Sequence, residues 1–261
     1  MSNSRETQAL LTLQQKILSL PGHLGFYYKN LVTGVTFGVH EDDVFGAASV
    51  IKLPLYLLIL QKTLDSKLNM ESTLRVSSAD KVPICGALTL FTHDVTTDVR
   101  TLCRLMISLS DNTATNVLID HLGISAIQEG FARFGLEKTA LRRKLFDRAA
   151  SQAGIQNTIC PHEIGDLLEK LHRQSILSPT LCREAIDTLL LQQIDHKLNG
   201  KILGEVPIAH KTGEDDNLSN DVGIVYAPQP FVICFAGQNT DLYRWQDLMR
   251  QGAWDMLRAQ E

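Results

Sequence analysis

A serine and a lysine three residues apart open the most apolar segment of the chain, since Ser49 and Lys52 directly precede the run 53–64. If this segment is helical, the two side chains lie on one face. An amine beside apolar side chains loses proton affinity, so Lys52 can accept the proton of the Ser49 hydroxyl. The positive end of the helix would stabilise an oxyanion formed there. The spacing therefore predicts a serine nucleophile with a lysine base. A second such pair, Ser78 and Lys81, lies in a polar, loop-like stretch, and we interpret it as accidental.

The tripeptide Ser110-Asp111-Asn112 follows an apolar helical run, 102–109. A hydroxyl and an amide presented where one helix gives way to the next can relay a proton and hold a substrate carbonyl or amide. Taken alone, the same tripeptide is explained as an N-cap, because Ser and Asp accept hydrogen bonds from the first N–H groups of a helix. The tripeptide is a candidate for catalysis only together with other motifs.

The tripeptide Lys211-Thr212-Gly213 lies on a predicted strand. The lysine and the threonine could bind an anionic or carbonyl group, and the glycine would let a substrate approach the backbone closely. Taken alone, it is better explained as the turn of an edge strand with a solvated lysine. The three motifs gain weight when they are considered together.

The elements that must position these residues fall into three blocks. A helix at Arg5–Ser19 ends at Pro21-Gly22, and two β-prone runs follow it. From Ser49 to Asn199 the pattern is mainly helical, and then strand character returns before a closing helix. The predicted strands are Leu24–Lys29, Val35–His40, Ile208–Thr212, Val222–Tyr226 and Phe231–Ala236, and the predicted helices beyond the first include Leu53–Leu64, Asp111–Leu122, Pro161–Leu171 and Trp245–Arg258.

Two strands do not form a stable sheet alone, so we expect the N-terminal pair to join the three C-terminal strands. Residues 1–45 and 201–261 would then form an α/β sheet domain, and residues 46–200 an all-helical domain. The candidate residues would meet in the cleft between the two domains, where small-molecule sites commonly form.

The composition excludes several classes of protein. The chain has 261 residues and 29.0 kDa, with 44% apolar and 21% charged residues, which is typical of a globular protein and not of disordered or coiled-coil chains. A net charge of −4 without long runs of one sign argues against nucleic acid or an anionic membrane as a partner. We expect a monomer that acts on a small molecule.

The cysteine and histidine patterns indicate neither a metal nor a cofactor, since the chain contains no CxxC and no HExxH. Reduced thiols fit a reducing compartment. No signal peptide or membrane-spanning run is visible, so we expect a cytoplasmic protein as written; a trimmed export signal would leave the same sequence. The five cysteines are Cys85, Cys103, Cys160, Cys182 and Cys234.

The order S-x-x-K, S-D-N, K-T-G is the motif set of class A β-lactamases and penicillin-binding proteins, and the sequence resembles that superfamily from about residue 20 to its end. The resemblance implies an α+β fold: an α/β sandwich with a five-stranded antiparallel sheet, terminal helices and an inserted helical lobe. The segments that carry it are Phe45–Pro54, Leu105–Asn116, His210–Gly213 and Asp221–Val225.

The resemblance also implies roles for the motif residues in acylation. Ser49 is the acylated nucleophile, and Lys52 is its base or proton relay. Ser110 passes a proton to the leaving amine. The backbone N–H groups of Ser49 and Glu214 form the oxyanion hole.

The remaining motif residues would bind the substrate. Asn112 would hold the amide of the substrate's side chain, and Lys211 and Thr212 would bind its carboxylate. Gly213 would leave room for the substrate beside the strand.

The sequence departs from class A β-lactamases in two places. Those enzymes clear the acyl-enzyme with a water held by a glutamate, and the corresponding stretch here, 141–148, contains no glutamate. Asp147 is its one carboxylate, and it could be the deacylation base or pair with a neighbouring arginine. Where such enzymes usually supply a second cation after K-T-G, this chain has the acidic run 214–216, which either weakens the attraction of anionic substrates and favours an amine or solvates a hairpin.

Three functions remain open at this point. The first is a serine hydrolase that acts on β-lactam or related amide bonds. The second is a penicillin-binding peptidase or amidase that acts on D-amino acids. The third is a slow-turnover protein that binds β-lactams as a sensor and is not an enzyme.

Overall fold

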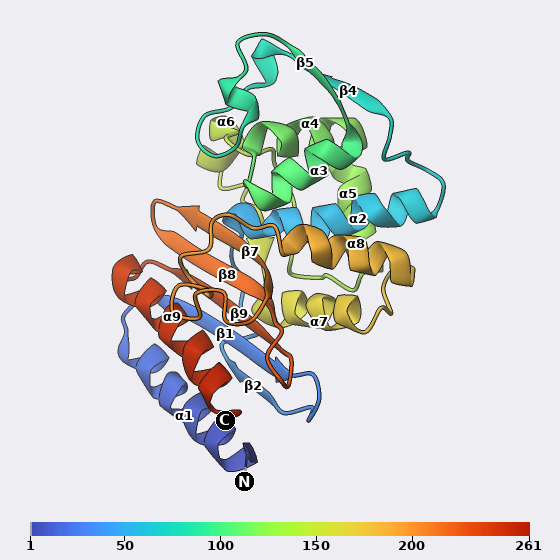
Figure 1. Cartoon of the computed structure of the whole chain (residues 1–261). Helices are drawn as coiled ribbons and strands as arrows, with labels where there is room; N and C mark the ends of the chain where they lie inside the picture. The colour runs from blue at the N-terminus through green and yellow to red at the C-terminus, as the bar shows by residue number, and fades with distance from the viewer. Residues whose placement is uncertain (1) are drawn as a thin grey trace.

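The computed structural model describes residues 2–261 and has an α+β architecture with a sheet below a helical lobe (Figure 1). The five strands of the main sheet are antiparallel in the order β2-β1-β9-β8-β7. This confirms the predicted fold, in which the N-terminal strands join the C-terminal ones. The strands are β1 (His23–Asn30), β2 (Thr36–Val39), β7 (Ile208–Asp215), β8 (Leu218–Val225) and β9 (Phe231–Gln238).

Helices cover both faces of the sheet. On the outer face α1 (Ser2–Ser19) packs against α9 (Leu242–Arg258), and on the inner face α7 (Pro161–His172) lies across β1, β9 and β8 (Figure 1). The Asp241 carboxylate caps α9 by accepting from the N–H of Arg244. The buried ring of Trp245 then meets Phe235 edge-on. Each face of the sheet therefore has its own hydrophobic core.

The helical lobe lies between β3 and β7 in the chain. It also contains two short ladders, in which β3 (Phe45–Gly46) pairs with β6 (Thr158–Ile159) and β4 (Thr73–Val76) pairs with β5 (Val95–Asp98). Strands of two to four residues are too short to show a period in the sequence, and they were not predicted. The helices of the lobe are α2 (Lys52–Leu64), α3 (Val99–Ser108), α4 (Asn112–Leu122), α5 (Ile124–Arg133), α6 (Arg148–Gln152) and α8 (Pro179–Leu189), with 3-10 turns η1 (Ala48–Ile51), η2 (Ser78–Asp80) and η3 (Leu88–Leu90).

The central helix of the lobe is α2, and its residues 52–60 are all buried. The apolar run that predicts this helix therefore has apolar neighbours on every side, and Lys52 stands at its buried N-terminal end. Across the described residues, no helix is both long and apolar enough to cross a membrane. Within residues 2–261, no three or more His, Cys, Asp or Glu side chains lie close enough together to bind a metal ion.

Candidate active site

The predicted nucleophile lies at the junction of the lobe and the sheet. Ser49 belongs to the 3-10 turn η1, which leads directly into α2, and it is half-buried. The preceding Ala48 has φ +41°, a value that L residues rarely adopt. This sharp turn brings the backbone N–H of Ser49 against strand β7, where a methyl group added to Gly213 would lie only 3.1 Å from Ser49 N. A side chain at this position would push the turn away from the strand by a few tenths of an ångström.

The ammonium group of Lys52 lies at the centre of the site. The side chain is fully buried, and its Nζ donates to Ser49 Oγ at 2.9 Å and to Asn112 Oδ1 at 2.7 Å. It also reaches two acceptors of Ser110, the backbone oxygen at 2.8 Å and Oγ at 3.0 Å. The structure thus brings together the serine and lysine of the first motif and the side chains of Ser110 and Asn112 from the second.

The three residues of the second motif have different structural roles. Ser110 has φ +53° and joins the end of α3 to the start of α4, so its carbonyl and hydroxyl both turn toward Lys52. Asp111 is the N-cap of α4, where its carboxylate accepts from the N–H of Ala114 at 2.9 Å. The capping role and the catalytic role proposed for this tripeptide therefore fall on different residues. Asn112, the first residue of α4, faces the site.

The third motif closes the site from the sheet. Lys211 is fully buried on strand β7, and its Nζ donates to Ser110 Oγ at 3.1 Å. Ser110 Oγ therefore lies between two ammonium groups, a position from which a proton can be passed on. Thr212 is buried opposite Asp221 of β8, and Glu214 is opposite Ser219.

Burial sets the protonation of the two lysines. Desolvation lowers the pKa of Lys52 well below its ordinary value, and the neighbouring charge of Lys211 lowers this pKa further. Desolvation, with the charge of Lys197 next, lowers the pKa of Lys211 to about 7. An amine with a lowered pKa can be neutral at physiological pH, which is the state that a general base requires.

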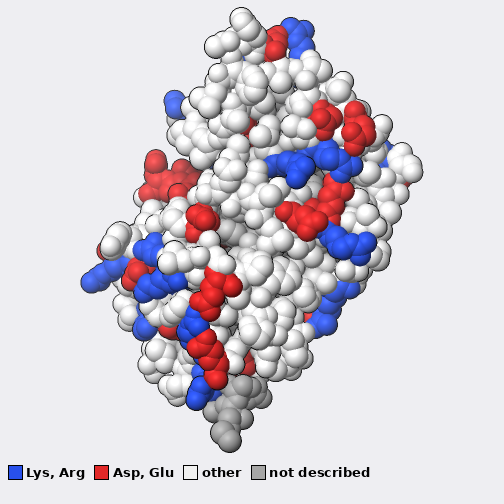
Figure 2. Space-filling model, viewed as in Figure 1, with Lys and Arg blue, Asp and Glu red and all other residues white. Residues whose placement is uncertain are grey.

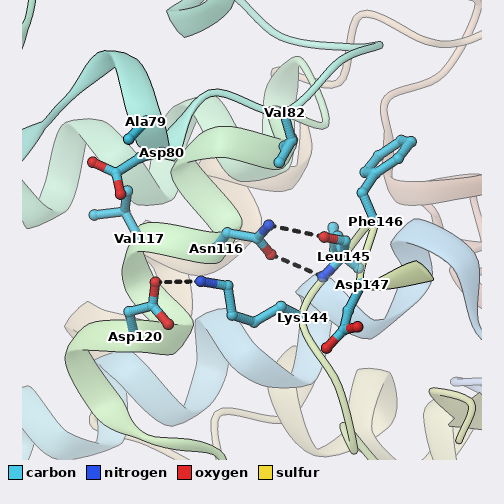
Figure 3. A pocket seen from close by; sticks show the side chains of 10 residues that line it. All are labelled: Ala79, Asp80, Val82, Asn116, Val117, Asp120, Lys144, Leu145, Phe146 and Asp147. Atoms are coloured by element: carbon cyan, nitrogen blue, oxygen red, sulfur yellow. Dashed lines mark hydrogen bonds and ion pairs between the residues drawn. The ribbon is translucent and has the colours of Figure 1, made fainter. Parts of the chain in front are cut away.

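The segment that lacks the glutamate is held against α4 (Figure 3). The side-chain amide of Asn116 accepts from the N–H of Leu145 at 2.8 Å and donates to the oxygen of Leu145 at 2.9 Å. Lys144 pairs with Asp120, one turn further along α4, at 2.6 Å. Figure 3 shows these contacts on one wall of a cavity of about 270 Å³.

Asp147 lines the same cavity, and its carboxylate accepts from the N–H of Ala150 at 2.9 Å as the N-cap of α6. This bond joins Asp147 to the helix that follows it, whereas Ser49, Ser110 and Asn112 join to Lys52. Its role in deacylation stays a prediction. The residue whose backbone is clamped to α4 is Leu145, which is apolar and which the motif analysis passed over.

Sequence reasoning also missed Lys197, a fully buried cation behind strand β7. Its Nζ lies 3.1 Å from Glu214 Oε1 and donates to the oxygen of Asn220 at 2.8 Å. The chain therefore does place a second cation beside the third motif, together with the acidic run after it. No pattern in the sequence singles out Lys197, because it lies in a segment without helical or strand periodicity.

Several known proteins are similar to this chain. A beta-lactamase of Rhodobacter capsulatus is 31% identical over 165 residues, which are 61% of this chain and 55% of that enzyme, so the match spans about half of the relative's length. The structure of the protein PBP-A is 28% identical, with a TM-score of 0.88 over 97% of this chain and 96% of PBP-A. A mutant of PBP-A in an acyl-enzyme complex with penicillin G has a TM-score of 0.87, 28% identity and the same coverage.

A family assignment follows from a match that extends over most of the chain. Residues 6–252 match the family described as the beta-lactamase enzyme family, and this range contains all three motifs and both elements that hold the nucleophile. The chain therefore belongs to the beta-lactamase enzyme family.

Proposed function

We propose that this protein is a serine hydrolase that forms an acyl-enzyme through Ser49 with β-lactams or closely related amides. The observation that carries the proposal is the buried amine of Lys52, 2.9 Å from Ser49 Oγ, with a pKa that burial and Lys211 lower. Neutral Lys52 can accept the hydroxyl proton, which reverses the direction of that hydrogen bond. The proposal rests on this geometry and on the family of the chain.

The acylation step follows from the positions of the side chains. Ser49 Oγ attacks the carbonyl carbon as its proton passes to Lys52 Nζ, and the N–H groups of Ser49 and Glu214 bind the resulting oxyanion. The C–N bond then breaks, and the leaving nitrogen takes a proton from Ser110 Oγ. Ser110 regains a proton from Lys52, or from Lys211 at 3.1 Å. The proton taken from Ser49 is therefore matched by the proton given to the leaving nitrogen.

Substrate binding is assigned to the remaining residues of the motifs. Lys211 binds a substrate carboxylate, and Thr212 reaches the same group from the other side of β7, which is the edge strand of the sheet. Asn112 binds the amide of the acyl side chain, and Gly213 keeps the strand close to the bound molecule. Asn112 is held for this role between Lys52 and the backbone oxygen of Ile84, to which its Nδ2 donates at 2.7 Å.

Slow deacylation is the second part of the proposal. Hydrolysis of the ester needs a water activated by a base, and the segment 141–148, whose backbone is clamped to α4 at Leu145, contains no glutamate for this role. A penicillin-binding protein that stays acylated, either a D-amino-acid peptidase or a sensor, is therefore the alternative to an efficient β-lactamase. The PBP-A mutant seen as an acyl-enzyme with penicillin G is in keeping with this alternative.

The test is intact-protein mass spectrometry over time after mixing with a penicillin and with a cephalosporin. We expect an adduct with the mass of the whole β-lactam on the wild type and none on Ser49→Ala. An adduct that disappears while hydrolysed product accumulates would mean a β-lactamase. A lasting adduct would mean a penicillin-binding protein, and no adduct with either compound would contradict the proposal.

A further inference from the structure

Lys197 lies behind the catalytic strand, on the face of β7 that is turned away from Ser49. It comes from the segment 190–207 between α8 and β7, and none of its surface is exposed. Its Nζ contacts the oxygen of Gly213 at 3.5 Å, Ser219 Oγ at 3.4 Å and the oxygen of Asn220 at 2.8 Å. These neutral groups solvate the ammonium but do not cancel its charge.

Glu214 supplies the opposite charge. Side chains alternate along a strand, and because Gly213 faces Ser49, the Glu214 side chain points to the far face. There its Oε1 lies 3.1 Å from Lys197 Nζ and 3.0 Å from His196 Nε2. Although partial burial acts to raise the pKa of Glu214, Lys197 and then His196 outweigh it, and the pKa is lowered. The carboxylate is therefore ionised at neutral pH. Burial lowers the pKa of Lys197, whereas the charges of Asp221 and Glu214 raise it, and protonated Lys197 forms with Glu214 a pair without net charge.

Both members of the pair act on Lys211, the residue assigned to the substrate carboxylate. The charge of Lys197 lowers the pKa of Lys211 and the charge of Glu214 raises it, so both charges act on the group that would bind the substrate carboxylate. Asp221 of β8, which is bound to His210 at 2.9 Å, and Cys85 also raise the pKa of Lys211. The Lys52 ammonium faces the same group through Ser110 Oγ.

More negative charge lies at the tip of the β7–β8 hairpin. Asp215 and Asp216 follow Glu214 directly, and both are exposed. Figure 2 shows acidic side chains gathered where this hairpin turns. The attraction of the site for an anion therefore depends on the balance between the buried lysines and the nearby carboxylates. Removal of the Glu214 carboxylate would leave the charge of Lys197 unbalanced.

We propose that Glu214 is a specificity-determining residue, which pairs with Lys197 and so withdraws a positive charge from the carboxylate-binding end of the site. The substrate class that this favours is an amide or lactam with an uncharged group, in place of a carboxylate, beside Lys211. The inference rests on the proposed function, since it concerns the substrates that acylate Ser49.

The test compares an anionic and an uncharged form of one compound, benzylpenicillin and its methyl ester. The second-order rate constant of Ser49 acylation is measured for each by intact-protein mass, and the ratio of acid to ester is the readout. Glu214→Gln keeps the shape and the backbone N–H while it frees the charge of Lys197. Measured at pH 6, below the pKa of about 7 of Lys211, so that this ammonium stays protonated when the charge of Glu214 is lost, the ratio should rise by about 3- to 10-fold at low salt and by less at high salt.

Two further variants separate charge from disruption. Lys197→Met removes the buried cation and leaves Glu214 with His196 alone, so the ratio should fall below that of the wild type. The double variant Lys197→Met/Glu214→Gln removes both charges, and its ratio should return to within about twofold of the wild type. A purely structural effect would change both rate constants in the same direction in every variant.

An unchanged ratio in Glu214→Gln, or single variants that shift the ratio in the same direction, would overturn the inference. Because Glu214 is half-exposed, Glu214→Gln carries the test by itself if Lys197→Met does not fold. If the wild type is acylated by neither compound, the proposed function fails, and the inference fails with it.

Discussion

The two walls of the site are built on different principles. On the nucleophile wall, Lys52 and Lys211 are fully buried, and their ammonium groups meet at Ser110 Oγ. The second wall, residues 142–148, lies one turn further along α4; it is half-buried or exposed, and the segment is attached to α4 through its backbone at Leu145. The first wall is buried and rich in ionisable groups, whereas the second has a hydrogen-bonded backbone with an apolar side chain.

This difference separates the two halves of a hydrolysis. Acylation needs a nucleophile, a base and an oxyanion site held in advance, and the nucleophile wall has the first two in contact. Deacylation needs a water and a group to activate it. The comparison therefore predicts fast acylation and slow release, and each wall can be tested separately.

Loss of the nucleophile should have the largest effect. In Ser49→Ala no oxygen remains to attack, and we expect the acylation rate to fall by at least about 10³-fold. Ser78→Ala is the matched control, because Ser78 begins the other S-x-x-K and its hydroxyl binds only Asp94 at 3.3 Å. Acylation measured by intact-protein mass should be lost in the first variant and kept in the second. Equal acylation of both would mean that a different residue is acylated.

A carboxylate added to the second wall should make the two walls alike. On α4, Asn112 contacts Lys52, and Asn116, four residues later, binds the backbone of Leu145. The attachment point of Leu145 is therefore one helical turn from the amide that contacts Lys52. In Leu145→Glu, we expect a carboxylate that can hold a water and speed deacylation by about 10- to 100-fold.

Leu145→Gln is the control for this gain, since it has the same shape and no basic carboxylate. The lifetime of the penicillin adduct should shorten in Leu145→Glu and stay near the wild-type value in Leu145→Gln. Equal lifetimes in all three proteins would show that this wall does not face the ester.

The pH dependence of acylation should report the nucleophile wall alone. Lys52 must be neutral to act, so rates rise with pH through its lowered pKa. Lys211 must be protonated to bind a carboxylate, so acylation by benzylpenicillin should fall above its pKa of about 7, by about tenfold for each pH unit. The methyl ester needs no ammonium partner and should show no alkaline fall below pH 9. An identical fall for both compounds would place the loss elsewhere.

The sequence predicts the first wall much better than the second, for a physical reason. Lys52 and Lys211 belong to elements with strong periodicity, Ser49 and Ser110 lie directly beside such elements, and the motif order tells which elements meet. The sheet was predictable in the same way, because its strands are apolar runs bounded by turns. Their contacts in the structure follow from burying these elements together.

The residues that sequence patterns did not identify lie in loops, where hydrophobic residues show no helical or strand periodicity. Leu145 sits among basic residues in a loop, and only the paired hydrogen bonds of Asn116 single it out. Lys197 is a charged residue in the segment 190–207, and its burial appears only when that segment folds behind β7. Contacts that depend on the path of a loop are set by tertiary structure, which a pattern along the chain does not contain.

Removal of the loop clamp should weaken the second wall without reaching the first. Asn116→Ala deletes two hydrogen bonds to the backbone of Leu145, and we expect the free energy of unfolding to fall by about 1–3 kcal/mol. Adduct formation at Ser49 should change little, whereas proteolysis within 141–147 should become faster. Thermal unfolding and limited proteolysis measure both effects. Slower acylation at unchanged stability would show that the two walls are coupled.

The smallest effect is expected at Asp147. Its carboxylate caps α6, and an asparagine caps a helix about as well as an aspartate. Asp147→Asn should therefore leave the lifetime of the adduct within about twofold, whereas a deacylation base would lose at least about 10²-fold. Asp147→Ala removes the cap as well and should cost about 1 kcal/mol of stability. A long-lived adduct in Asp147→Asn alone would assign the base to this residue and give the second wall a chemical role of its own.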